Sequence, residues 1–195
     1  MNAPGTASSV RRPFRIIGVT EDTRYLAGGR LAFLKMMDAT CSPDFHVTIF
    51  CSEGATQAHF SPRRASCIRI KASHRRIIGP ILFFVKLFFK MTPTVAGSDV
   101  VVVNSGYTVP LVLFTSKVLR KKVVVLQHDA DTMTFLQKMA SSRSRRLTAI
   151  VRWMMSYPPL LLVDGVLCIS ETTRNGLAKM GILPKTFVVG NVVDI

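Results

Sequence analysis

Four short motifs in this 195-residue sequence carry groups that could do chemistry. They are Gly28-Gly29, Ser105-Gly106, His128-Asp129 and Ser170-Glu171. The imidazole of His128 titrates near neutral pH, so it could donate a hydrogen bond or move a proton at a reacting centre. Glycines at a helix start would let a phosphate approach free backbone amides. The motifs together therefore suggest a site for a polar or anionic substrate.

Each motif also has an interpretation that involves no ligand. A Gly-Gly pair and Ser105-Gly106 could be simple turns, and His128 could bond to its neighbours in a surface loop. Asp129 is expected to orient that loop rather than to react. Ser170 is a good helix N-cap and Glu171 favours the positive end of a helix dipole, so this pair could be a cap. Both interpretations stay open. His128 is the candidate catalytic residue, and the candidate substrate-binding residues are Gly28, Gly29, Ser105, Gly106, Asp129, Ser170 and Glu171.

Alternating apolar segments must position these motifs. Strands are expected over 15–20, 45–51, 67–70, 99–104, 122–127, 164–169 and 186–189. Helices are expected from Gly28-Gly29 onward and over 78–91, 110–119, 132–157 and 171–180, the last two ending at Pro158-Pro159 and Gly181. The alternation predicts an α/β fold with a doubly wound parallel sheet. Because ligands bind at the carboxyl ends of such strands, we expect the four motifs to share one rim.

The sequence is strongly basic, with 26 Lys and Arg against 11 Asp and Glu and a net charge of +15. This excess implies an anionic partner. No acid occurs over 54–98 or 132–163. Basic residues lie beside apolar segments in both stretches, and the predicted patch residues are Arg75, Arg76, Lys86, Lys90, Arg143, Arg145 and Arg146. We predict contact with an anionic membrane surface, although the segment 78–91 could instead be a core helix packed on the sheet.

Several classes of protein are not expected. The hydrophobic fraction of 48% argues against disorder, and the length favours one domain. We find no signal peptide, no uncharged apolar run of about 20 residues, and no aromatic-basic module typical of nucleic-acid binding. The four cysteines show no C-x-x-C spacing, which fits a reducing compartment. A cytoplasmic protein, peripheral at the inner face of the membrane, is therefore the expectation.

Four stretches of the chain resemble one known family. Gly28-Gly29 followed by FHVT at 45–48 resembles a pattern ending in GHxV, and DVVVVNS at 99–105 resembles DVVHxHS. VVVLQHD at 123–129 resembles vvxtvHd, and DGVLCISE at 164–171 with NVVD at 191–194 resembles aDxvixvSe…NGVD. The order and spacing resemble those of the N-terminal domain of family-four GT-B glycosyltransferases. Val192 departs from the pattern because the family has glycine there.

This resemblance implies a Rossmann-like domain of a GT-B enzyme. In similar enzymes the histidine equivalent in position to His128 lies at the reaction centre, and a C-terminal domain binds the nucleotide-sugar donor. The implied reaction moves a sugar from that donor to a lipid-linked or phosphorylated acceptor, with no metal and no cofactor.

The family's donor-binding residues have no counterpart in this sequence. We therefore expect a flexible N-terminus at 1–13, the acceptor-side domain at 14–190 and the start of an interdomain hinge at 191–195, with a donor domain supplied in cis or in trans. Activity of this chain alone is not implied. The alternative is a non-catalytic membrane-docking or regulatory module with the same fold.

Overall fold

The computed structural model describes 12–20, 29–52, 61–71, 78–104, 106–127, 150, 154–155, 157–179, 181–182 and 186–189. Several predicted site residues lie outside these ranges: Gly28, Arg75, Arg76, Ser105, His128, Asp129, Arg143, Arg145 and Arg146. Most of the predicted helix 132–157 and the predicted hinge also lie outside them.

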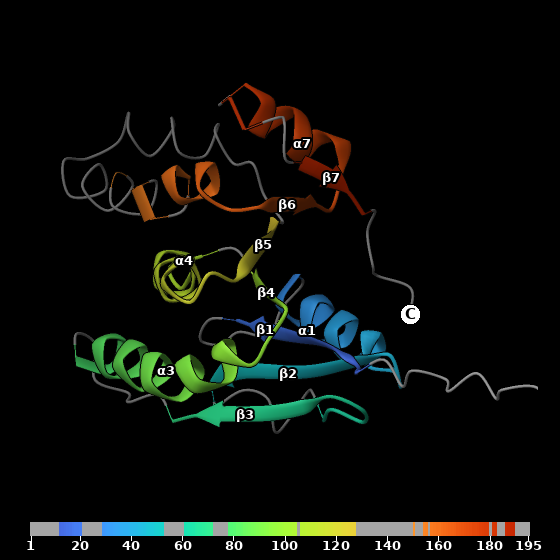
Figure 1. Ribbon diagram of the computed structural model, residues 1–195. Helices are drawn as coiled ribbons and strands as arrows, with labels where there is room; N and C mark the ends of the chain where they lie inside the picture. Colours follow the sequence, from blue (N-terminus) through green and yellow to red (C-terminus); the bar gives the residue numbers. More distant parts are fainter. Residues whose placement is uncertain are drawn as a thin grey trace, which may run out of the picture.

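Seven parallel strands form one sheet, as the sequence predicted (Figure 1). The strands are β1 (Phe14–Val19), β2 (Phe45–Ser52), β3 (Ser66–Ile70), β4 (Val100–Asn104), β5 (Lys122–Gln127), β6 (Gly165–Cys168) and β7 (Thr186–Val188). Their order is β3-β2-β1-β4-β5-β6-β7. The chain thus adds β2 and β3 on one side of β1, and then adds β4 to β7 on the other side. This is the doubly wound α/β arrangement, confirmed in every described strand pair.

Within the described ranges the helices with defined bounds are α1 (Gly29–Thr40), α3 (Ile78–Ala96), α4 (Val109–Val118), the short 3-10 helix η1 (Pro158–Leu161) and α7 (Glu171–Ala178). Helix α3 continues through Pro93 to Ala96, so its predicted end near 91 was wrong. The fully buried side chain of Val95 packs against the core and holds the last turn despite the proline. The prolines that we expected to end a helix occupy the first positions of η1, where no backbone N–H is needed.

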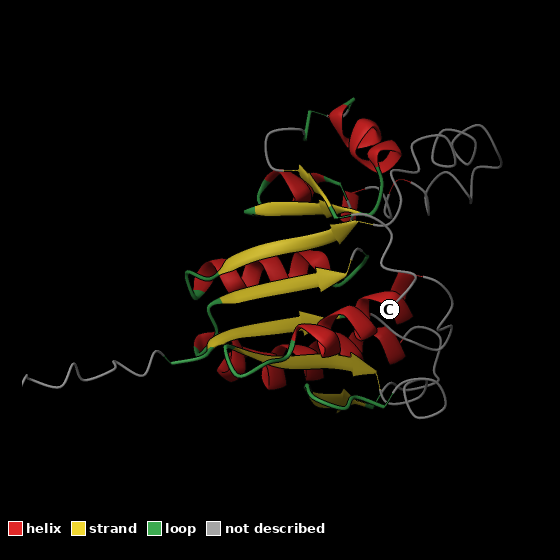
Figure 2. Cartoon of the chain, turned by 90° about the vertical axis from the view of Figure 1, so that its right-hand side faces the viewer, coloured by secondary structure: helices red, strands yellow, loops and turns green. Residues whose placement is uncertain are grey.

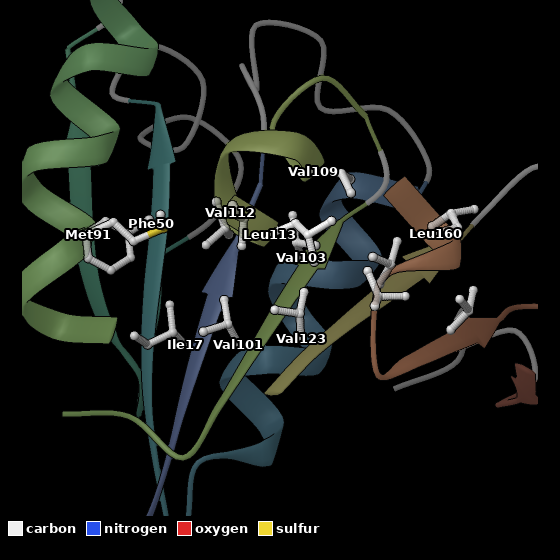
Figure 3. Close-up of a cluster of buried hydrophobic side chains, with 14 of the residues drawn as sticks. Ile17, Phe50, Met91, Val101, Val103, Val109, Val112, Leu113, Val123 and Leu160 are labelled. Atoms are coloured by element: carbon white, nitrogen blue, oxygen red, sulfur yellow. The ribbon is translucent and has the colours of Figure 1, made fainter. Parts of the chain in front are cut away.

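Helices cover both faces of the sheet (Figure 2). Beneath them the sheet separates two hydrophobic clusters. Neighbouring strand residues point to opposite faces, so Ile17 belongs to the larger cluster and Ile16 to the smaller. The larger cluster lies under α3 and α4 and includes alternate valines of β4 (Val101, Val103) and β5 (Val123, Val125), several of which are labelled in Figure 3. Phe33, Leu34 and Met37 of α1 cover the smaller cluster. Figure 1 shows α1 on one side of the sheet and α3 and α4 on the other.

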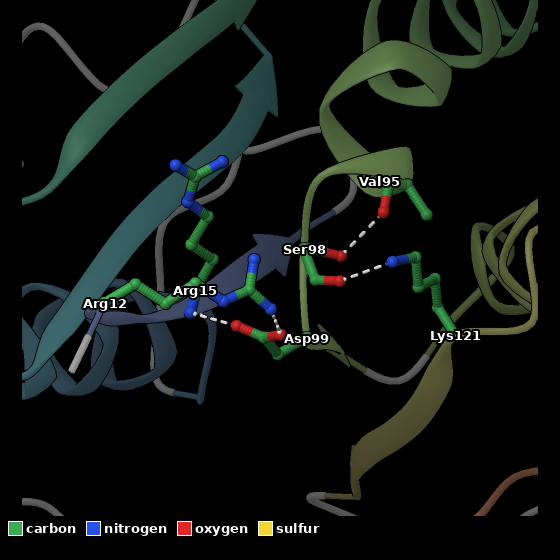
Figure 4. Close-up of polar contacts among 6 residues, drawn as sticks. All are labelled: Arg12, Arg15, Val95, Ser98, Asp99 and Lys121. Carbon is green, nitrogen blue, oxygen red and sulfur yellow. Dashed lines mark hydrogen bonds and ion pairs between the residues drawn. The ribbon is translucent and has the colours of Figure 1, made fainter. Parts of the chain in front are cut away.

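Two aspartates of the family-like motifs hold the amino-terminal edge of the sheet. Asp99 precedes β4 and accepts hydrogen bonds from the backbone N–H of Arg15 and from the guanidinium of Arg12, both at 2.8 Å (Figure 4). Asp164 precedes β6 and accepts from the N–H of Val123 at 2.8 Å and from Lys117 at 2.9 Å. Each carboxylate therefore ties the start of its own strand to the start of the neighbouring one. We infer that these motif positions serve strand register.

A third aspartate, Asp38 near the end of α1, ties this helix to the segment before β3. Its carboxylate accepts from the backbone N–H groups of Arg63 (3.1 Å), Arg64 (2.9 Å) and Ala65 (2.8 Å), immediately before that strand. Burial by itself would raise the pKa of Asp38, but the three backbone donors outweigh it and the pKa lies below its ordinary value. The ionised carboxylate is thus the form that anchors this segment.

Candidate functional site

The carboxyl-terminal edge of the sheet gathers small buried polar side chains. Thr20 follows β1 and is fully buried, as is Ser52 at the end of β2. Asn104 and Gln127 end β4 and β5 and are 2% and 6% exposed. The amide of Asn104 donates to the hydroxyl of Thr20 at 3.4 Å, which joins the ends of two neighbouring strands. We call these four residues the polar rim.

None of the rim residues was selected as a site residue from the sequence. The signal was present, because each ends an apolar strand that is followed by a connection to a helix or another strand. Such a residue is expected at the ligand-binding edge of a doubly wound sheet. Its polar character alone did not distinguish it from an ordinary loop residue.

Gly106 lies two positions after the rim residue Asn104, which ends β4. Its backbone has a φ of +144°, a conformation that side chains with a Cβ rarely adopt. Its carbonyl accepts from the N–H of Val109, where α4 begins. The turn interpretation of Gly106 is confirmed, and substrate binding there stays a prediction.

Ser170 and Glu171 form the start of α7. The hydroxyl of Ser170 accepts from the N–H of Thr173 at 3.2 Å, so Ser170 is the N-cap that the sequence predicted. The carboxylate of Glu171 pairs with Arg174 at 3.3 Å and is largely exposed. Both side chains have structural partners, and a contact with substrate stays a prediction for each.

For the other predicted residues of this edge, the structure describes Gly29 and the strand ends that precede Ser105 and His128 in the chain. Gly29 is the first residue of α1, on the connection that leaves β1. His128 directly follows Gln127, the last residue of β5, and Ser105 directly follows Asn104. Their strands therefore end at the polar rim, as predicted, although His128 and Ser105 themselves are not described.

Two cysteines near the rim interact with one another. The Sγ atoms of Cys51 on β2 and Cys67 on β3 are 3.2 Å apart. This hydrogen bond, opposed by burial and aided by Arg69, lowers the pKa of Cys67 to about 7. Burial raises the pKa of Cys168, which lies in the core. The sequence had suggested only small hydrophobes at these positions, since a contact between neighbouring strands leaves no short spacing in the chain.

Lys86 and Lys90 both lie exposed on α3. The same helix buries Phe83 and Leu87 in the core. The segment 78–91 was predicted either to contact a membrane or to be a core helix. These two interpretations are compatible, because one side of α3 packs in the core and another side is exposed. Among the described residues, no group of three His, Cys, Asp or Glu side chains is arranged to hold a metal ion. No helix in the described ranges is long and apolar enough to cross a bilayer.

Comparison with models of known protein families shows to which family the chain belongs. The model of Glycosyltransferase Family 4 matches residues 35–195. The chain belongs to this family. Family 4 membership and the parallel sheet together show a Rossmann-like N-terminal domain of the GT-B type, as the resemblance implied. A search of the curated proteins gives no significant match.

Several solved structures share this fold. HepE from Anabaena, in complex with UDP and glucose, has a TM-score of 0.60 at 12% identity over 91% of this chain and 44% of its own. UDP-GlcNAc 2-epimerase from Neisseria meningitidis has a TM-score of 0.59 at 13% identity, covering 93% and 47%. A UGT transferase from Siraitia grosvenorii has a TM-score of 0.60 at 14% identity, covering 92% and 52%. This family 4 chain spans about half the length of each of these proteins.

Proposed function

We propose that this family 4 chain is the acceptor-side half of a glycosyltransferase. It transfers a sugar from a nucleotide-sugar donor to a lipid-linked or phosphorylated acceptor, together with a donor-binding domain in the same chain or in another. The observation that carries the proposal is the polar rim at the carboxyl ends of four parallel strands in a chain that belongs to this family. The ligands named for the similar structures also support it. UDP is a nucleotide, glucose is a sugar and UDP-GlcNAc is a nucleotide sugar.

In this proposal the chain contributes position rather than cofactor chemistry. The buried hydroxyl and amide groups of Thr20 and Asn104 give the rim fixed hydrogen-bonding groups in a setting shielded from water. His128, directly after β5, acts as hydrogen-bond donor or proton acceptor for the acceptor hydroxyl. The donor domain neutralises the charge that develops on the departing diphosphate.

The proposal is tested by isolating the protein together with any domain encoded beside it. Release of nucleoside diphosphate from UDP-sugars is then measured with and without a membrane lipid extract as acceptor. We expect release that depends on the extract. A neighbouring reading frame without a second Rossmann-like domain, combined with no nucleotide-sugar binding by this chain, would contradict the proposal and favour the non-catalytic module.

A further inference from the structure

Helix α3 presents apolar side chains on two opposite sides. The buried stripe, at most 5% exposed, is Phe83, Leu87, Met91 and Val95. The exposed stripe is Ile81 (58%), Leu82 (40%), Val85 (46%) and Phe89 (70%). At 3.6 residues per turn these two sets lie on opposite sides of the helix. A helix that only covers a sheet carries polar residues on its outer side, so the exposed stripe needs another explanation.

The neighbouring helix also exposes apolar side chains. Helix α4 packs beside α3, on the same side of the sheet (Figure 1). It exposes Phe114 (63%) and Val118 (65%), one turn apart. We call the exposed stripe of α3 together with these two residues the α3–α4 outer face. Large exposed apolar side chains grouped on two adjacent helices mark an interaction site more strongly than scattered ones do.

The charged side chains that α3 places beside this face are both positive. Lys86 and Lys90 lie one turn apart along the edge of the exposed stripe, and α3 contains no acid. Neither lysine has an ion-pair partner among the described residues, whereas Lys117 of α4 is paired with Asp164. Two uncompensated ammonium groups therefore border the apolar surface.

We propose that the α3–α4 outer face docks on an anionic lipid bilayer. A bilayer surface supplies both required chemistries, because its phosphates attract the lysines and its acyl region accepts the apolar side chains. The lysine stems can lie along the apolar stripe while their ammonium groups reach the phosphates. A second copy of this chain fits less well, since a two-fold contact on α3 would bring lysines together with no acid from that helix to offset them.

The helix lies along the membrane surface in this arrangement. Its inner stripe is fixed in the core by Leu87 and Met91, so only the outer side is available to lipid. The polar rim belongs to an edge of the sheet, not to the face that α3 and α4 cover, so docking of that face leaves the edge with the rim uncovered. Access of a lipid-linked acceptor to the rim rests on the proposed function, but docking itself does not.

Docking is tested by flotation of the purified chain with phosphatidylcholine vesicles, with and without phosphatidylglycerol, and without donor or acceptor. We expect binding to the anionic vesicles that weakens at high salt. Each of Lys86→Ala and Lys90→Ala should weaken it about fivefold. Phe89→Ser should weaken it about tenfold without unfolding the protein, because this ring is 70% exposed.

Two matched controls lie elsewhere on the chain. Lys35→Ala removes an exposed lysine from α1, across the sheet, and Phe187→Ser removes an exposed ring from β7. Neither should change vesicle binding. Circular dichroism and thermal unfolding establish that each variant is folded.

Three outcomes would overturn the proposal. The first is equal vesicle binding by the wild type and the folded α3 variants, and the second is a wild-type dimer that Phe89→Ser dissociates. The third is binding to duplex DNA that the lysine variants lose and Phe89→Ser keeps. If the wild-type protein binds anionic vesicles but shows no sugar transfer, the result would contradict the proposed function and leave the docking proposal standing.

Discussion

The two ends of the parallel strands use polar groups in different ways. At the amino-terminal edge, Asp38, Asp99 and Asp164 are committed to backbone N–H groups of neighbouring segments. At the carboxyl-terminal edge the described strand ends carry uncharged side chains, such as Thr20, Asn104 and Gln127. Carboxylates thus tie neighbouring segments together at one edge, whereas buried, neutral hydroxyl and amide groups end the strands at the other. Resemblance to a family motif therefore does not by itself mark a residue as part of the site.

The largest difference in activity should be between two histidine variants, one for each edge of the sheet. Under the proposed function, His128→Ala should lower sugar transfer about 100-fold or more, because general acid–base groups contribute on that scale. Its free energy of unfolding should stay unchanged. His46, exposed near the start of β2, is the matched control, and His46→Ala should leave transfer intact. Equal losses in the two variants would remove the distinction between the edges. Steady-state kinetics and urea unfolding measure both quantities.

Asp99→Ala should instead act on stability. It leaves the N–H of Arg15 and the guanidinium of Arg12 without their shared acceptor. The Asp99 side chain is only 19% exposed, so we expect a loss of about 2 kcal/mol in the free energy of unfolding. Asp44→Ala removes an exposed acid at the same edge and should cost much less. A kcat decrease in folded Asp99→Ala at low temperature would mean that the amino edge also serves catalysis.

Ser170→Ala tests the cap at the carboxyl edge. Removing the acceptor for the N–H of Thr173 should cost about 1 kcal/mol in unfolding free energy. Ser170→Thr keeps a capping hydroxyl and should restore most of that stability. If KM for the acceptor rises in Ser170→Ala but not in Ser170→Thr, the hydroxyl contacts substrate as well. An unchanged KM in both would restrict Ser170 to the cap.

Asp38 should make a small, pH-dependent contribution to stability. Because its pKa is lower in the folded protein, the stabilisation is fully present above the ordinary carboxyl pKa of 3.8 and is lost as pH falls through the folded pKa. Asp38→Asn should therefore unfold more easily at neutral pH, by less than about 1 kcal/mol given its exposure. The difference from wild type should shrink below about pH 4. Urea midpoints across this range measure it, and a difference that grows on acidification would contradict the assignment.

Much of the fold could be predicted from local patterns. Runs such as VVVV before Asn104 and VVVL before Gln127 are apolar and β-branched, which few structures other than buried strands accommodate. The cap at Ser170 and the helix end at Gly181, whose φ is +77°, were also readable because both depend on local backbone geometry. The end of α3 was not, since burial of Val95 overrides the local effect of Pro93.

The sequence by itself determined the alternation of strands and helices, the family resemblance and the excess of positive charge. Tertiary structure decided how the polar groups are shared between the two edges. It placed Asp99 against Arg15 and Asn104 against Thr20, each pair 84 positions apart in the chain. It also divided α3 into a buried and an exposed apolar side. The physical reason is that hydrogen bonding and burial depend on neighbours across the sheet, which local periodicity does not specify.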